Sequence, residues 1–295
     1  MTTAGAAGTW TIGDLTVNRV GFGAMRLTGN GMMGNSDGPP IDRDRAIAIL
    51  RQAVELGVNH IDTASFYFSP LRSANELINS ALAPYPGDLV IATKVGPWRD
   101  PWGEWPDRAA PGQLRGLVEE NLRQLGRDHL DLVYFRRSRQ ESIAEHFGAL
   151  AELRDAGLIR HLGVSGVQPV HVTEAQAIAP VTCVQNSYAL DNRRADVSGL
   201  IDLCQAQGIA FVPFFAISGT QREAQASQDH DDSVLAIARA HDATPAQIRL
   251  AWTLHRGPHV LAIPGTRDLA HLAENVAAAG LHLSADELAR LSGQP

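Results

Sequence analysis

The sequence contains only two cysteines, no long apolar run and no excess of positive charge, and each shortage excludes a class of protein. Cys183 and Cys204 lack CxxC spacing and nearby histidines, so we expect two buried thiols in a reducing compartment. Without a run of about 18 apolar residues, no membrane span is expected. The net charge of −7 argues against a nucleic-acid-binding surface, which is usually basic.

Signals for export and for metal binding are also missing. The first ten residues, MTTAGAAGTW, have neither the basic start nor the apolar segment of a signal peptide, so we expect a cytoplasmic protein. The 11 histidines are scattered and include no HExxH motif, so no metal site is expected. We interpret His60 as a strand residue that faces the helix layer. GNGMMG, residues 29–34, matches the dinucleotide-binding GxGxxG pattern, but loop sequence follows it, so we interpret it as a flexible lid or loop.

The sequence does contain a repeated alternation of short apolar strands with helices. Expected strands cover residues 20–24, 58–64, 89–96, 129–136, 160–166, 181–188, 209–216 and 260–265, after a hairpin at Gly13 and Asp14. Expected helices cover residues 42–56, 73–83, 113–125, 143–156, 169–178, 199–207 and 269–279, with two more after residue 231 and an extra carboxy-terminal helix capped by Ser284 and Glu287. Eight units predict one α/β domain over residues 1–295, a (β/α)8 TIM barrel, rather than an open doubly wound sheet.

Barrel active sites lie at the carboxyl ends of the strands, so the polar residues at those ends are candidate catalytic residues. Asp62, Lys94 and Tyr67, which follows the second strand, form a chemically sensible unit. A nearby ammonium lowers the pKa of a phenol, and a carboxylate keeps that ammonium charged and aimed. Such a phenol can protonate a carbonyl oxygen. A structural ion pair between Lys94 and Asp62 is the alternative.

Several motifs together resemble one enzyme family. GFGAM, GVNHIDTASFY, ATKVG, LGVSG, VQNSY and IPGTRDLAHLAEN occur in the order and spacing of the aldo-keto reductases, from about Thr9 to Leu291. The resemblance is strongest to bacterial reductases, some of which act on pyridoxal-like aldehydes. It implies a TIM barrel that binds NADPH, with Tyr67 as general acid and with Lys94 and Asp62 tuning its acidity.

The resemblance also implies which residues hold the cofactor. Ser165 and Gln185 would contact the nicotinamide carboxamide, and Phe214 would stack on the ring. Arg267 and neighbouring groups would bind the 2′-phosphate, assisted by the free N–H groups of a helix start. The full expected set is Gly23, Ala24, Met25, Ser165, Gln185, Phe214, Thr266, Arg267, His271, Glu274 and Asn275, the last two contacting adenine. A solvent-facing loop position for Arg267 is the alternative.

The sequence departs from the family pattern at the end of the fourth strand, where Arg136 stands in place of the usual histidine. If Arg136 faces the site, it offers a fixed fork of donors and a permanent charge, which favours the Tyr67 phenolate and attracts an anionic ligand group. We expect this orientation, with Arg137 pointing the other way because strand side chains alternate. An outward Arg136 is the alternative. Gly166 and Phe215 are further departures, where the family usually has asparagine and a small hydroxyl residue.

The expected function is NADPH-dependent reduction of an aldehyde or ketone to an alcohol, with an anionic or planar aromatic substrate favoured. Trp98, Trp102 and Met32 are expected to line the substrate side, because aromatic and thioether groups suit a planar ligand. We expect a small-molecule carbonyl compound as the substrate, and neither nucleic acid nor membrane as a partner. We expect the protein to be a monomer or a weak homo-oligomer. Arg136 keeps open a barrel that binds NADPH in a non-redox or regulatory role, and a barrel that binds no nucleotide is the third possibility.

Overall fold

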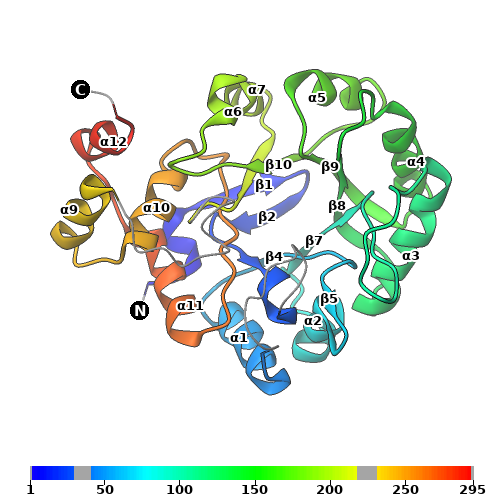
Figure 1. Ribbon diagram of the computed structural model, residues 1–295, viewed down its shortest axis with the longest axis horizontal. Coiled ribbons are helices and arrows are strands. Elements are labelled where there is room, and N and C mark those ends of the chain that lie inside the picture. The colour runs from blue at the N-terminus through cyan, green and yellow to red at the C-terminus, as the bar shows by residue number, and fades with distance from the viewer. Residues whose placement is uncertain (1, 30–40, 218–230, 294–295) are drawn as a thin grey trace.

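The computed structural model describes residues 2–29, 41–217 and 231–293, and it shows a ring of parallel strands inside a ring of helices (Figure 1). Seven strands form one sheet in the order β11-β10-β9-β8-β7-β4-β3. Their bounds are β3 Phe22–Gly23, β4 His60–Asp62, β7 Val90–Val95, β8 Leu130–Arg136, β9 Ile159–Ser165, β10 Cys183–Ser187 and β11 Ala210–Phe214. Parallel bridges from Phe211 to Val260 and from Ala262 to Val20 close the ring. The predicted (β/α)8 barrel is confirmed.

The closure of the barrel is less regular than the sequence suggests. Residues 260–265 make isolated bridges instead of a full strand, and Pro264 in this stretch has no N–H to donate to a ladder. The predicted first strand is shortened, because the chain turns into the 3-10 helix η2, Ala24–Thr28, directly after Gly23. A Cβ added to Gly23 would lie 2.7 Å from the carbonyl oxygen of Ile263. Glycine is therefore required where the first and last strand positions approach each other.

A hairpin closes the amino-terminal end of the barrel. Strands β1, Thr9–Ile12, and β2, Leu15–Asn18, pair antiparallel across the predicted turn. Ile12 and Val17 pack against apolar side chains that point inward from the barrel strands. In Figure 1 the two blue strands cross the centre of the ring. The amino-terminal end of the barrel is thus sealed with apolar groups, which leaves its opposite end for a site.

The helices pack on the outside of the strand ring (Figure 1). Their bounds are α1 Arg43–Glu55, α2 Ala74–Leu82, α3 Leu114–Leu125, α4 Ala144–Asp155, α5 Pro169–Gln176, α6 Arg194–Val197, α7 Leu200–Ala206, α9 Asp232–Ala240, α10 Pro245–Leu254, α11 Leu269–Ala277 and α12 Ala285–Leu291. The remaining elements are the 3-10 helices η1 Ala4–Ala7, η3 Pro111–Gln113 and η4 Ala278–Gly280 and the small strands β5 Phe68–Ser69 and β6 Arg72–Ser73. The capping box of Ser284 and Glu287 is confirmed; the short helix α6 was not predicted.

Alternation along the strands decides which side chains enter the barrel. In β7, Val90 and Ala92 belong to the apolar cluster inside the barrel, whereas Ile91 and Val95 pack beneath the helices. Because strand side chains alternate, Lys94 continues the inner row. The row is apolar at the hairpin end and charged at its carboxyl end, so the charge meets the open mouth of the barrel.

The same parity corrects the expectation for His60. His60 lies two residues before Asp62 in β4 and shares its inward face, with its ring against Gly21. The expectation that it faces the helix layer was wrong, because residues two apart in a strand point to the same face and Asp62 points inward. The ring is fully buried, and burial lowers the pKa of His60 from 6.5 to about 4.

Both cysteines are free and buried, as expected. The sulfur of Cys183, inside the barrel, lies 3.0 Å from the hydroxyl of Tyr134. Across the described ranges, no helix has the length and apolarity needed to cross a membrane. Nor do the side chains in those ranges bring three or more His, Cys, Asp or Glu together as metal ligands.

Candidate active site

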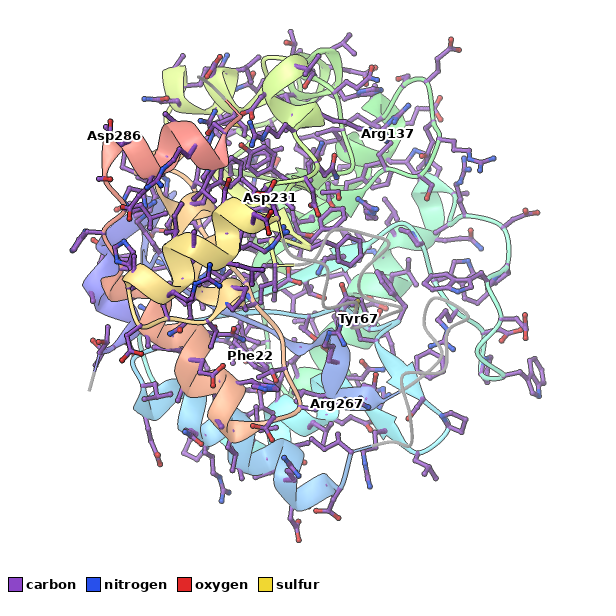
Figure 2. The ribbon with its side chains drawn as sticks, turned by 60° about the vertical axis from the view of Figure 1, so that its left-hand side comes forward. Phe22, Tyr67, Arg137, Asp231, Arg267 and Asp286 are labelled. Atoms are coloured by element: carbon purple, nitrogen blue, oxygen red, sulfur yellow. The ribbon has the colours of Figure 1, made fainter. Side chains whose placement is uncertain are left out.

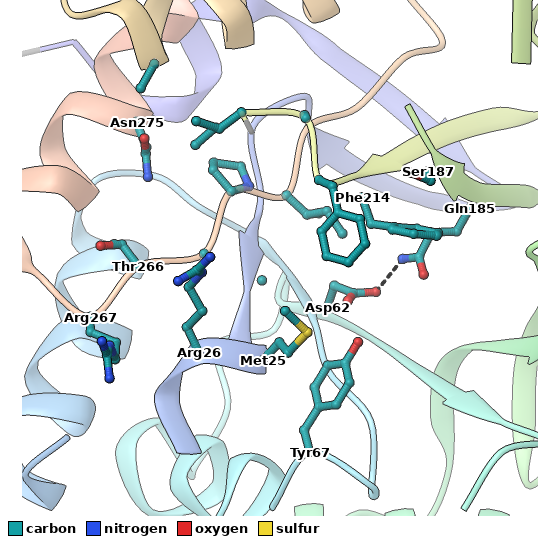
Figure 3. A pocket seen from close by; sticks show the side chains of 18 of the residues that line it. Met25, Arg26, Asp62, Tyr67, Gln185, Ser187, Phe214, Thr266, Arg267 and Asn275 are labelled. Carbon is teal, nitrogen blue, oxygen red and sulfur yellow. Dashed lines mark hydrogen bonds between the residues drawn. The ribbon is translucent and has the colours of Figure 1, made fainter. Parts of the chain in front are cut away.

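A cavity of about 1230 Å³ opens at the carboxyl ends of the strands. Residues that line it come from nearly every unit of the barrel, so distant parts of the sequence converge on one volume (Figure 3). They include Gly23, Met25, Arg26, Asp62, Phe66, Tyr67, Lys94, Trp105, Arg136, Gln185, Ser187, Phe214, Phe215, Thr266, Arg267, His271, Glu274 and Asn275. We refer to the part around Tyr67, Lys94 and Arg136 as the inner end, and to the part around Arg267 and Asn275 as the outer end.

The predicted unit of Asp62, Tyr67 and Lys94 lies at the inner end. The ammonium of Lys94 donates to Oδ1 of Asp62 at 2.5 Å and to the carbonyl oxygen of Thr63 at 3.0 Å. The same ammonium lies 4.9 Å from the centre of the Tyr67 ring. All three side chains are buried. The pair of charges is therefore shielded from water and held against the phenol, and Lys94 is the single lysine among 25 basic residues.

Hydrogen bonds behind the strands hold this unit in place. The hydroxyl of Thr63 donates to Asn75 at 2.7 Å, and that of Thr93 donates to Asn121 at 2.6 Å. Asn75 in turn donates to Asn121 at 2.9 Å. These buried groups connect β4 and β7 to helices α2 and α3, and their strand neighbours are Asp62 and Lys94. A fully bonded buried network of this kind fixes the strands in register.

The acidity of Tyr67 differs from the sequence-based expectation. Burial raises the pKa of Tyr67 above its ordinary 10.0, although the charges of Lys94 and Arg136 act in the opposite direction. For Lys94, burial alone would lower the pKa, but the Asp62 carboxylate and Tyr67 together outweigh burial, so the pKa is raised. The expected net lowering for the phenol was wrong, because desolvation of a buried phenolate exceeds the attraction of nearby cations. Tyr67 is therefore a protonated donor at neutral pH.

Arg136 faces the site, as expected. Its Nη1 donates to Oγ of Ser165 at 3.2 Å, and its guanidinium lies 4.9 Å from the centre of the Phe214 ring. Arg137 points elsewhere: its Nε donates to the carbonyl oxygen of Gln140 at 2.6 Å, and Figure 2 shows it well apart from Tyr67. Alternation along the end of β8 accounts for the difference between the two arginines.

A chain of hydrogen bonds runs from Arg136 to the ion pair. Ser165 donates to Oε1 of Gln185 at 3.4 Å, and Nε2 of Gln185 donates to Oδ2 of Asp62 at 2.6 Å (Figure 3). Each member comes from a different strand of the barrel. Because Asp62 accepts from Gln185 on one oxygen and from Lys94 on the other, both of its oxygens are engaged. The chain links the two cationic groups of the inner end through neutral donors and one carboxylate.

Phe215 marks the rim of the inner end. Its φ of 65° is in the left-handed region, which is unusual for a bulky side chain. This turn at the end of β11 lets Phe214 and Phe215 both line the cavity, with their ring centres 5.0 Å apart in an edge-to-face arrangement. Strained backbone of this kind is typical of binding sites, where a fixed side-chain position is worth its local cost.

The outer end is cationic. Thr266, Arg267 and His271 line it as predicted, and Arg26 joins them from η2. Figure 3 shows Arg26 between Thr266 and Met25. Sequence reasoning missed Arg26, although it directly follows the GFGAM motif that supplied Gly23 and Met25. Two guanidinium groups at one end of a cavity suit a phosphate-bearing ligand.

The backbone N–H groups at the start of α11 are bound by a side chain of the protein itself. Asp268 is the N-cap, and its Oδ1 accepts from the backbone N–H groups of Ala270 at 2.8 Å and His271 at 3.2 Å. The other oxygen of Asp268 pairs with Nη2 of Arg45 at 2.7 Å. These N–H groups are therefore occupied by a carboxylate, and the expectation of free N–H groups was wrong. An anion at this end of the cavity would meet side-chain cations instead.

Some predicted contacts do not reach the cavity. Ser165 is fully buried and Ala24 lies beneath the surface, so neither lines it. Trp98 and Trp102 also lie outside it, and the structure brings Trp105 to the wall instead. Met32 lies outside the described residues. Neither composition nor spacing distinguishes the three tryptophans, because the conformation of their long loop decides which one turns inward.

The cavity suits a dinucleotide. Its outer end offers guanidinium groups for phosphates, its inner end offers the Phe214 ring for a planar ring, and Gln185 supplies an amide beside it. This lining fits NADPH: Arg267 and Arg26 would bind its phosphate groups, and Phe214 and Gln185 would lie beside its nicotinamide. Aromatic rings combined with a small number of placed polar groups are the usual composition of a cofactor site.

Comparison with known proteins agrees with this geometry. The model of the Aldo/keto reductase family matches residues 19–293. The chain belongs to this family. It is 43% identical over 296 residues to Pyridoxine 4-dehydrogenase of Escherichia coli strain K12, covering 98% of both chains. It is 40% identical over 290 residues to an uncharacterised oxidoreductase of Schizosaccharomyces pombe, covering 98% of this chain and 90% of that protein.

Solved structures support the same assignment. An aldo-keto reductase from Klebsiella pneumoniae in complex with NADPH superimposes with a TM-score of 0.79 at 25% identity, covering 100% of this chain and 96% of that one. A thermostable aldo-keto reductase bound to the inhibitor epalrestat gives a TM-score of 0.80 at 28% identity, covering 97% and 98%. This aldo/keto reductase is therefore an NADP-dependent oxidoreductase of carbonyl compounds.

Proposed function

We propose that this aldo/keto reductase uses NADPH to reduce a planar aromatic aldehyde with an anionic oxygen near its carbonyl group, as in pyridoxal. The observation that carries the proposal is the buried unit of Tyr67, Lys94 and Asp62 at the inner end of the cavity. The 43% identity to Pyridoxine 4-dehydrogenase supports a substrate of the pyridoxal type.

Each residue of the unit has a distinct part in the reaction. Bound NADPH supplies the hydride. Tyr67 donates its phenolic proton to the carbonyl oxygen as negative charge grows there. Lys94, kept charged by Asp62, stabilises the phenolate that remains on Tyr67. The result is an alcohol, and the proton that Tyr67 has lost returns from water after the product leaves.

Arg136 sets the substrate preference. An arginine keeps its charge at all working pH values and does not act as a proton donor, so it replaces the usual histidine only as a hydrogen-bond donor and a cation. Its guanidinium lines the same cavity as Tyr67. A substrate oxygen that is anionic and close to the aldehyde gains from this charge. Trp105 and Phe66, whose ring centres are 5.7 Å apart, provide an aromatic wall for the planar ring.

The test measures NADPH oxidation with pyridoxal, 2-carboxybenzaldehyde and benzaldehyde. The wild type is expected to prefer the two anionic aldehydes, and Tyr67→Phe is expected to lower kcat/KM by about 10²- to 10⁴-fold without loss of NADPH binding. Tyr85→Phe is the control, because the Tyr85 hydroxyl donates to Leu125 at 2.7 Å away from the cavity. Full activity in Tyr67→Phe would contradict the assignment of the acid.

The same assay separates the other functions that the sequence leaves open. NADPH binding without turnover of any of the three aldehydes would favour a non-redox or regulatory barrel. Loss of the preference for anionic aldehydes in Arg136→Gln, with benzaldehyde turnover retained, is the result expected if Arg136 selects the substrate.

A further inference from the structure

The guanidinium of Arg136 lies among the residues expected to hold the nicotinamide. It donates to Ser165 at 3.2 Å, it lies 4.9 Å from the centre of the Phe214 ring, and Ser165 links it to Gln185 at 3.4 Å. Ser165 is fully buried and does not line the cavity, whereas Arg136 does. A planar cation therefore stands where Ser165 was expected to meet the cofactor.

The charges at the inner end do not cancel. Asp62 and Lys94 pair at 2.5 Å and together contribute no net charge. Within the described parts of the chain, no carboxylate forms an ion pair with Arg136, whose charge is then left over. The side chain is partly buried, and burial lowers the pKa of Arg136 while leaving a guanidinium charged at neutral pH. A site with a neutral histidine at this position would have no such excess of positive charge.

The two redox states of the cofactor differ in the charge of the nicotinamide ring. The oxidised nicotinamide ring is a cation, and the reduced ring is neutral. Like charges at short range in a partly dehydrated site repel each other more strongly than in water. An unbalanced guanidinium beside the ring therefore weakens the binding of the oxidised cofactor and has no such effect on the reduced cofactor.

We propose that Arg136 makes the cavity discriminate between the redox states of its cofactor, weakening the binding of NADP⁺ relative to NADPH. This inference rests on the proposed function only in that the cofactor binds at this cavity. It adds a consequence for turnover: the oxidised cofactor left after each reduction is bound less tightly and leaves more readily. The substrate role of Arg136 is separate, because cofactor binding is measured without substrate.

The experiment compares dissociation constants for NADPH and NADP⁺, each titrated alone and followed by tryptophan fluorescence. Arg136→Gln is expected to lower the ratio of the NADP⁺ constant to the NADPH constant by about tenfold or more. Arg136→Lys, which keeps the charge, is expected to preserve the ratio. Arg137→Gln is the matched control, because this neighbouring arginine points away from the cavity. An unchanged ratio in Arg136→Gln, or a parallel change of both constants, overturns the proposal.

Arg136→His gives an internal second test. A histidine with an ordinary pKa near 6.5 is charged at about pH 6 or below and neutral at about pH 8. The ratio in this variant is expected to fall as the pH rises through that range, whereas the wild-type ratio stays constant. The phosphates common to both cofactors cancel in the ratio. A pH-independent ratio in Arg136→His, with unchanged thermal unfolding, contradicts a charge effect.

Failure of this inference and failure of the proposed function give different results. If wild-type protein binds neither cofactor, both fail. If the ratios follow the predicted pattern but Tyr67→Phe keeps full activity, the proposed general acid is wrong and the discrimination stands. If turnover behaves as proposed and the ratios do not respond to charge at position 136, only the discrimination is wrong.

Discussion

Arg136 and Gly166 fit one another at the ends of the neighbouring strands β8 and β9. A Cβ added to Gly166 would lie 2.5 Å from Nη1 of Arg136 and 2.9 Å from the carbonyl oxygen of Arg137. The φ of Gly166 is +70°, a conformation that favours glycine. The presence of Arg136 and the absence of a side chain at position 166 are therefore coupled in the structure. The arginine takes the space that a side chain at position 166 would fill.

Gly166→Ala is expected to displace Arg136 and to destabilise the fold. The positive φ alone costs about 1 kcal/mol for a residue with a Cβ, and the contacts with Arg136 and the Arg137 carbonyl add to it. Urea unfolding measures the loss. The variant should also lose the NADP⁺ to NADPH discrimination assigned to Arg136.

Gly208→Ala is the matched control for this substitution. Gly208 has a φ of +66°, but a Cβ there would meet nothing within 4 Å. The difference in unfolding free energy between the two variants measures the clash with Arg136 and with the Arg137 carbonyl oxygen. If both variants lose the same unfolding free energy and Gly166→Ala keeps the cofactor discrimination, the position of Arg136 does not depend on the absence of a side chain at position 166.

The pH dependence of reduction should reflect a raised pKa at Tyr67. Burial holds the phenol protonated beyond its ordinary pKa of 10.0, and the reaction needs the protonated form. We therefore expect kcat/KM for a neutral aldehyde to stay constant up to about pH 9 and to decline only at higher pH. A decline centred near neutral pH would mean that the cations at the inner end overcome burial. Benzaldehyde is the suitable substrate, because it does not titrate.

Asp62→Asn should lower the pKa of Lys94, so that the ammonium loses its proton at a lower pH than in the wild type. Burial lowers the pKa of Lys94 and the Asp62 carboxylate raises it, so removal of the carboxylate should bring the pKa below 10.5. Because the chain has a single lysine, protein labelled with ¹⁵N in its lysine side chain gives one ammonium signal to follow by NMR.

The ion pair also affects stability. Removing one partner of a buried pair typically costs about 3 to 5 kcal/mol, so Asp62→Asn should unfold at lower urea concentration. Lys94→Met with Asp62→Leu replaces both charges by apolar groups and should recover much of the loss. In the NMR experiment, a lysine signal that titrates at the same pH in the wild type and in Asp62→Asn would show that Asp62 does not raise the pKa of Lys94.

His60 should make the protein sensitive to mild acid. Its pKa is about 4 in the folded state and 6.5 in the unfolded chain, so the unfolded state binds the extra proton between these values. Stability is therefore unaffected above pH 6.5 and falls as the pH drops towards 4, by about 3 kcal/mol from this residue. Urea unfolding at a series of pH values measures the slope.

His60→Asn is expected to flatten the stability profile in that range. His282→Gln is the control, because the His282 side chain lies nearer the surface, outside the barrel. Some carboxyl groups, such as those of Asp42 and Asp268, have pKa values below the ordinary 3.8 in the folded protein. Their protonation therefore lowers the stability only at more acidic pH. A profile that is equally steep in the wild type and His60→Asn would assign the acid sensitivity to other groups.

The sequence by itself determined the barrel and the members of its inner site. The apolar strands and the glycine and capping signals around the helices depend on near neighbours in the chain, so α1, α3 and α12 match their expected ranges closely. Residues at the carboxyl ends of parallel strands must meet at one mouth. Asp62 and Lys94 could therefore be placed together from the strand pattern alone.

Only the tertiary structure decided the acidity of Tyr67, the partner of Asp268 and the tryptophan that lines the cavity. The phenol pKa depends on how completely the fold removes water, and Asp268 depends on how the chain enters α11. Trp105, rather than Trp98 or Trp102, reaches the cavity because of a loop path that has no local signature. Desolvation and loop conformation arise from contacts across the whole molecule, whereas the pattern of a strand is written in consecutive residues.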